Sequence, residues 1–259
     1  MDILLDHPWV FFVLAFAALL ACVELGLRWR LRRRTSIDEA RQEQIAGVHG
    51  SVVVLLGLFL GFTLALAPQR FEQRRELVVD EANSIATTRL RAEMLPEPYR
   101  GKVQSLLSDY VDARVEFFNA GVDGNAMQAA LGRSKQLQNA LWQQTVGAAQ
   151  QSPTPVTAVF VSSENEMFDL GAKQLAALEN RIPGVIWVLL LFMAVLACLT
   201  LGSSLQRRFV LAMIVIPLLC SVMIALIAEL DSPRTGFLQV GLQSMQRLQS
   251  EAHSARAAH

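Results

Sequence analysis

The sequence predicts an all-α integral membrane protein, in which four transmembrane helices form two hairpins with a helical extramembrane domain between them. Composition is the first observation behind this prediction. Of the 259 residues, 53% are apolar and only 18% are charged, against about 25% charged in soluble domains. Secondly, the apolar residues gather in four long runs, each close to the roughly 20 residues that cross a bilayer as a helix. Thirdly, the polar stretch between the runs carries apolar residues at helical spacing.

The four apolar runs define the predicted spans: residues 8–27, 51–67, 183–201 and 209–228. The predicted parts are therefore an N-terminal hairpin 1–67, a helical domain 68–182, a C-terminal hairpin 183–230 and an amphipathic tail 231–259. Trp9, Trp29 and Trp187 near span ends are typical of membrane interfaces. A cleavable signal peptide is disfavoured for the first run, because Asp2 and Asp6 precede it without any Lys or Arg.

Three breaks divide the polar stretch into helices. Proline and glycine interrupt helices, and they occur here at Pro96-Glu97-Pro98, at Gly121 to Gly124 and at Ser152 to Pro155. The sequence therefore predicts helices over 69–95, 99–119, 125–150 and 155–181. The first continues out of the second span, and the last leads into the third. Their apolar stripes are expected to form a core or a subunit interface.

Basic residues near the spans bear on orientation. The connection after the first run is rich in arginine, whereas its N-terminal flank has no Lys or Arg; the arginines are Arg28, Arg30, Arg32, Arg33, Arg34 and Arg41. Basic flanks favour the cytoplasm and the first helix usually dominates, so the N-terminus is expected outside. Arg70, Arg74 and Arg75 after the second run favour the opposite arrangement. The side that holds residues 68–182 stays open.

The second span is the most patterned part of the chain. Four glycines share one helical face: Gly47, Gly50, Gly57 and Gly61. Bulky side chains occupy another face: Leu55, Phe59, Phe62 and Leu66. Small residues let helix backbones approach closely, so the glycines are predicted to pack against a neighbouring helix. The bulky face then meets lipid or core, or it forms the hydrophobic constriction of a pore.

Polar residues follow the second span along one predicted helical face. They are Arg70, Arg74, Glu81, Thr88 and Arg91. Two interpretations remain open. The residues form a solvated face with ion pairs, or they line a charged vestibule that leads from a pore.

Several classes of function find no support. The chain has no phosphate-binding loop, nucleophile elbow or metal-binding helix motif, so we expect no enzyme, metal or cofactor. Its 23 basic and 23 acidic residues balance, which argues against nucleic acid as a partner. Its three cysteines, Cys22, Cys198 and Cys220, lie inside apolar runs and are expected to act as small buried hydrophobes.

Three stretches of the sequence resemble the bacterial bestrophin-like membrane family, a distant relative of the bestrophin channels. The first is Leu60-Gly61-Phe62 with Arg70-Phe71. The second runs from Glu81-Ala82-Asn83 to Pro96-Glu97-Pro98. The third follows the fourth span and contains Asp231, Pro233 and Gly236. The resemblance covers nearly the whole chain.

The resemblance implies a homo-oligomer, pentameric in bestrophins, in which the second span lines a central ion pathway. It also implies a cytoplasmic helical domain. We therefore expect an oligomeric ion channel of a bacterial inner membrane, with the lipid bilayer and inorganic ions as partners. The alternative is a non-conducting membrane sensor or scaffold whose helical domain binds another protein.

Overall fold

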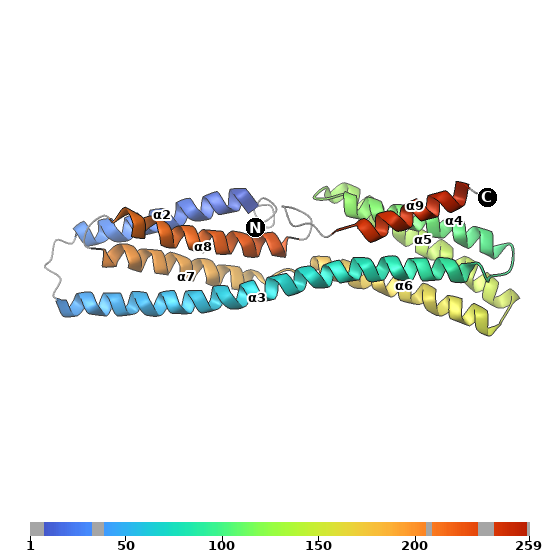
Figure 1. Ribbon diagram of the computed structural model, residues 1–259, viewed down its shortest axis with the longest axis horizontal. Helices are drawn as coiled ribbons and strands as arrows, with labels where there is room; N and C mark the ends of the chain where they lie inside the picture. The colour runs from blue at the N-terminus through green and yellow to red at the C-terminus, as the bar shows by residue number, and fades with distance from the viewer. Residues whose placement is uncertain (1–7, 33–38, 206–208, 233–240, 258–259) are drawn as a thin grey trace. The chain divides into compact units, whose positions relative to one another are not determined.

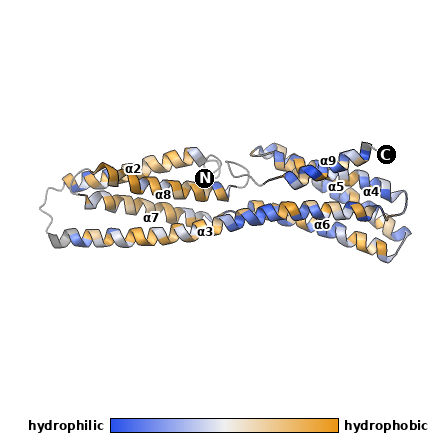
Figure 2. Ribbon diagram, viewed as in Figure 1, coloured by the Kyte–Doolittle hydropathy of each residue, from blue (hydrophilic) through white to orange (hydrophobic). Residues whose placement is uncertain are grey.

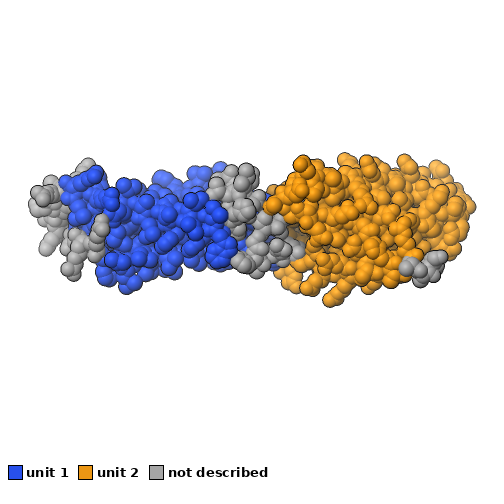
Figure 3. Space-filling view, turned by 90° about the horizontal axis from the view of Figure 1, so that it is seen from above, with its two compact units in different colours: residues 1–71, 181–238 blue, residues 72–180, 239–259 orange. Residues whose placement is uncertain are grey.

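The computed structural model describes residues 8–32, 39–205, 209–232 and 241–257, and within these ranges the regular elements are all α-helices (Figure 1). The chain divides into two compact units (Figure 3). A membrane unit contains residues 1–71 and 181–238, and a helical unit contains residues 72–180 and 239–259. The all-α prediction is confirmed.

Four helices of the membrane unit are long and apolar enough to cross a bilayer, as predicted. They are α2 (Pro8–Arg32), the first part of α3 (Glu39–Ala92), α7 (Gly184–Ser204) and α8 (Val210–Asp231). Figure 2 shows that apolar residues dominate α2, α7 and α8, whereas the second part of α3 is largely hydrophilic. Pro68 lies inside α3, close to the boundary between the units at residue 71.

Helix α2 packs most closely against α7 and α8 rather than against α3, its neighbour in sequence. Two glycines make the α2–α7 contact possible. A Cβ on Gly26 would collide with the carbonyl oxygen of Leu199, and a Cβ on Gly202 would collide with that of Val23. The predicted two-hairpin layout is therefore not fully confirmed, because the main partners of the first span are α7 and α8.

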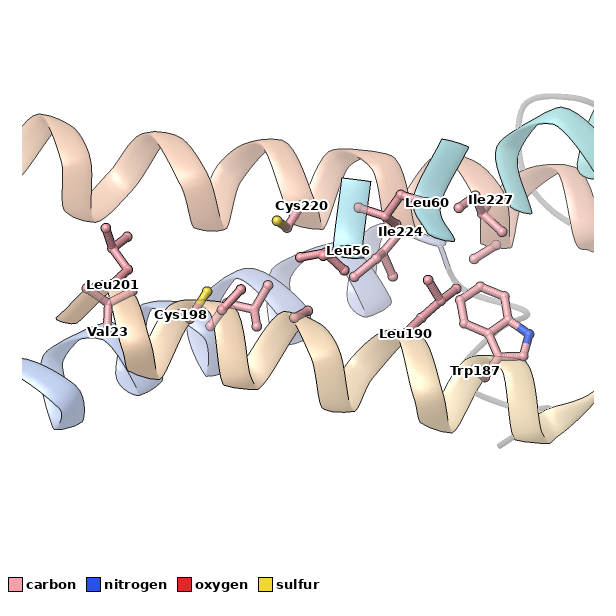
Figure 4. Packing of buried hydrophobic residues seen from close by; sticks show 14 of the residues in the cluster. Val23, Leu56, Leu60, Trp187, Leu190, Cys198, Leu201, Cys220, Ile224 and Ile227 are labelled. Carbon is pink, nitrogen blue, oxygen red and sulfur yellow. The ribbon is translucent and has the colours of Figure 1, made fainter. Parts of the chain in front are cut away.

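Side chains from all four helices build the core of the membrane unit (Figure 4). Leu56 and Leu60 extend from α3 toward the Ile224 region of α8 and the Leu190 region of α7. Trp187 is only 1% exposed, and its ring meets Phe11 edge-on with centroids 5.9 Å apart. Its indole thus fills the core, whereas Trp9 and Trp29 are exposed. The interfacial role of the three tryptophans stays a prediction.

The helical unit contains the second part of α3 with α4 (Tyr99–Asn119), α5 (Gly124–Gln151), α6 (Pro155–Glu179) and α9 (Gln243–Ala257). The predicted breaks separate these helices as expected. Asp123 caps α5 by accepting hydrogen bonds from the amides of Asn125 and Ala126, and Thr154 caps α6. Gly121 takes a positive φ of 55°, which glycine adopts without strain.

The predicted C-terminal tail contributes α9 to the helical unit. Met245 and Leu248 join the apolar core of this unit. On the outer side, Asp112 of α4 accepts hydrogen bonds from Gln249 and pairs with His253 at 2.9 Å. Helix α9 thus turns an apolar face to the core and a polar face to its surface, as an amphipathic helix packed on a helical bundle does.

Candidate pore-lining helix

The membrane part of α3 has one buried face. Leu56, Leu60, Thr63 and Ala67 recur at intervals of three and four residues and are each at most 6% exposed. This spacing places them on one side of the helix, where the leucines join the core described above. Every other direction of the helix is open or only partly covered by the chain itself.

The predicted constriction residues divide between open and partly covered positions. Leu55, Phe62 and Leu66 are 51%, 64% and 50% exposed. Phe59 is half-buried because it lies one position before Leu60 and packs against the core of the membrane unit. The sequence analysis missed Val54 and Leu58, which are also exposed. Only the position of the buried face could have revealed them, since apolar periodicity is absent from a helix that is apolar on every side.

In the part of the chain that the structure describes, nothing packs closely against the glycine face of α3. A Cβ added to Gly47, Gly50, Gly57 or Gly61 would meet no atom within 4 Å. The close helix approach predicted for these glycines is instead made by Gly26 and Gly202. No described residue of this chain packs closely against the α3 glycines, so their role in helix packing stays a prediction.

Three residues of the predicted polar face are buried in the helical unit, which contradicts both the solvated face and the vestibule for them. Arg74 donates to the carbonyl oxygens of Ala177 and Asn180, each at 3.0 Å, at the end of α6. Thr88 donates to the carbonyl oxygens of Ser84 and Ser163. The prediction failed because α6 covers this face, and a helical pattern in one segment does not reveal its neighbours.

Glu81, the third of these residues, forms a buried ion pair with Arg114 of α4. The Arg114 Nη2 group donates to Glu81 Oε2 at 3.0 Å and to Gln174 Oε1 of α6 at 2.6 Å. Arg114 also lies over the ring of Phe117, 4.8 Å from its centroid. These contacts join α3, α4 and α6. Satisfying both charges in this way offsets the cost of taking them out of water.

Tyr110 extends this network. Its hydroxyl accepts a hydrogen bond from Gln138 Nε2 at 3.3 Å and lies beside Gly171, where a Cβ would come within 3.1 Å of it. Burial, followed by the nearby Glu81 carboxylate, raises the pKa of Tyr110 to about 12. The group therefore stays neutral and acts structurally.

The remaining polar candidates are more open. Arg70 and Arg91 are half-buried, and Arg91 reaches the carbonyl oxygen of Val159 at 3.4 Å. Of the five predicted residues, these two are the ones that stay partly accessible within their own units.

Glu164 on α6 is a buried carboxyl that the sequence did not single out from its neighbours Glu166 and Asp169. It is 0% exposed, and neither oxygen has a hydrogen-bond partner among the described residues. Burial raises its pKa to about 7. Protonation is the way in which such a group avoids the cost of a buried charge.

The motif after the fourth span is only partly described. Asp231 is buried at the end of α8 and accepts hydrogen bonds from the Ile182 amide at 2.9 and 3.2 Å. The carboxylate thus fastens the start of α7 to the end of α8. Pro233 and Gly236 lie outside the described residues.

Polar chemistry in the membrane unit is sparse. His49 Nδ1 lies 3.0 Å from Thr200 Oγ1 and links α3 to α7. Among the described residues, no group of three or more His, Cys, Asp or Glu side chains is arranged to hold a metal ion. The three cysteines are free thiols.

Comparison with known proteins shows which proteins share this fold. Two structures of a bacterial bestrophin homologue from Klebsiella pneumoniae are similar in fold, one carrying a point substitution and one solved by Zn-SAD phasing. Their TM-scores are 0.66 and 0.65 at 12% and 13% identity, covering 96% of this chain in both cases and 97% and 98% of theirs. No curated protein matches the sequence. A family model described as a Bestrophin-like domain matches residues 12–245, and the chain therefore belongs to the bestrophin-like family.

Proposed function

We propose that this protein is a subunit of an oligomeric ion channel, in which the membrane part of α3 lines the ion pathway. The observation that carries the proposal is the exposure of this segment. Apart from the buried face described above, this segment leaves Val54, Leu58 and Phe62 53% to 71% exposed. A helix with one buried face and open apolar faces fits a position between its own subunit and a central axis.

Assembly of identical copies would cover the apolar and glycine faces of α3 that the single chain leaves exposed. The exposed glycines of α3 would allow close approach of a second helix. Rings of Phe62 and its neighbours would narrow the axis, and narrow apolar rings gate ion flow by excluding water. The family relationship supports a pentamer in a bacterial inner membrane, with inorganic ions as the permeating species.

Reconstitution into liposomes tests conduction. Phe62→Ala removes a ring that makes little contact within its own chain, because its side chain is 64% exposed. We expect a several-fold larger ion flux per oligomer than in the wild type, since a wider apolar constriction holds water more easily. The Phe59→Ala,Phe62→Ala double variant should increase flux further but lose stability, because Phe59 also packs against the core.

Phe192→Ala is the matched control. Phe192 is 61% exposed on α7, so the same atoms are removed from a span outside the proposed pathway, and flux should not change. If wild type and both pathway variants assemble correctly and remain electrically silent, the channel assignment fails. The alternative, a membrane sensor or scaffold whose helical unit binds another protein, then takes its place.

We propose that the N-terminus lies outside and the helical unit in the periplasm, because the connection after the first span is rich in arginine. Gly124 is an exposed position where a Cβ would meet no atom within 4 Å, so Gly124→Cys should be tolerated. In a background without Cys22, Cys198 and Cys220, an impermeant thiol reagent should label it on intact cells. Labelling only after lysis places the helical unit in the cytoplasm.

A further inference from the structure

A half-open pocket of about 560 Å³ lies between α2 and α7 in the membrane unit. Leu25, Trp29 and Leu199 give it apolar walls, and the hydroxyl-bearing residues Thr200 and Ser203 lie at one side. Gly26 also lines it, at the point where the two helix backbones touch. The pocket therefore combines an apolar lining with a floor that the close α2–α7 contact holds in place.

Two arginines line this pocket, and no acidic side chain does so among the described residues. Arg28 and Arg32 are four positions apart, so they project from the same face of α2. Arg28 donates its Nε group to Glu24 at 2.8 Å. Among the described residues its Nη groups have no partner, which leaves them for a ligand. The Arg28 side chain is 60% exposed, so it is accessible to an anion beside Glu24.

Arg30, between them in sequence, has a different role. It donates from Nη1 to the carbonyl oxygens of Ser203 and Ser204 at 2.8 and 3.0 Å. A cation there satisfies the open carbonyls at the C-terminal end of α7. Arg28 and Arg32 are therefore not needed to cap the C-terminal end of α7.

The pocket lies where the apolar runs of α2 and α7 end, which is where a spanning helix meets lipid headgroups. Arg28 follows directly on the apolar run of α2 that ends at Leu27, and Thr200 to Ser203 belong to the last turns of α7. Trp29 beside the arginines is a side chain that favours the membrane interface. An occupant would place charge at the arginines and apolar chain along Leu25 and Leu199.

We propose that this pocket binds an anionic phospholipid, with the phosphate at Arg28 and Arg32 and an acyl chain against Leu25, Trp29 and Leu199. Charge selects the anionic headgroup, since basic pockets between transmembrane helices recognise such lipids. The apolar walls select a lipid over free phosphate, because phosphate would leave them exposed to water. The site is independent of conduction.

Quenching of Trp29 fluorescence by brominated acyl chains measures occupancy in the full-length protein. We expect brominated phosphatidylglycerol to be preferred over brominated phosphatidylcholine by about fivefold for each arginine that contacts the headgroup. Arg28→Gln,Arg32→Gln should reduce this preference to near unity. Arg75→Gln,Arg133→Gln, which removes two exposed arginines from the helical unit, should retain it.

Three outcomes would overturn the assignment. Equal quenching by both lipids in the wild type means that the pocket does not select charge. A preference that persists in Trp29→Phe places the bound lipid near another tryptophan. Displacement of brominated phosphatidylglycerol by excess inorganic phosphate shows that the arginines bind the free anion rather than a lipid.

Discussion

The two units bring their helices together by different means. In the membrane unit, α2 and α7 approach through Gly26 and Gly202, and the core is apolar. In the helical unit, α3 is held to α4 and α6 by buried polar groups, above all the Glu81–Arg114 pair. The same helix, α3, is thus covered on its polar part by its own chain and left largely open on its apolar part. The open part is where further subunits can pack.

A large effect is expected at the α2–α7 contact. Gly26→Ala places a methyl group against the backbone of α7, which cannot move aside as a side chain can. We expect a loss of about 1–3 kcal/mol or more in stability, measured by thermal unfolding in detergent. A fall in stability that is no larger than in Gly57→Ala would contradict the contact.

Gly57→Ala is the matched control and also tests assembly. Its Cβ would meet no atom of the same chain within 4 Å, and alanine favours helix by about 1 kcal/mol over glycine. A variant that folds normally but loses its oligomeric size in light scattering would place Gly57 at a contact between subunits.

The largest effect is expected at the buried ion pair. Arg114→Met leaves the Glu81 carboxylate buried without its partner, which costs about 3–5 kcal/mol. Glu81→Leu,Arg114→Met should be less destabilised than Arg114→Met in chemical denaturation, since no lone charge remains. If the double variant loses as much as both single changes added together, the two residues are not coupled.

The sequence predicted the number of spans and the ends of α4, α5 and α6, because apolar run length and Pro or Gly breaks are local signals. It misassigned the contacts between helices. Four glycines on α3 look more like a packing motif than Gly26 and Gly202, which lie on different helices. Glu81 and Arg114 are 33 residues apart, so no helical periodicity links them. The buried state of Trp187 depends likewise on its neighbours.

The smallest expected effect is a change in the pH dependence of stability, caused by Glu164 in the helical unit. The raised pKa of Glu164, about 7, means that its contribution to stability is complete below the ordinary value of 4.5 and is lost as pH rises through 7. Glu164→Gln should therefore flatten the decline of the unfolding temperature between pH 5 and 8. The exposed neighbour variant Glu166→Gln should keep the wild-type profile, and an unchanged profile in Glu164→Gln would remove Glu164 as its cause.

The most direct test of the account is thiol accessibility along the membrane part of α3 during ion flux. Cysteines that replace Leu55, Phe62 or Leu66, introduced singly without the native thiols, should react with a water-soluble methanethiosulfonate reagent and change the flux. Cysteines that replace Leu56 or Leu60 should stay unreactive, because the chain buries these positions. Unchanged flux at all three exposed positions, or equal reaction at Leu56 and Leu60, would contradict an ion pathway along α3.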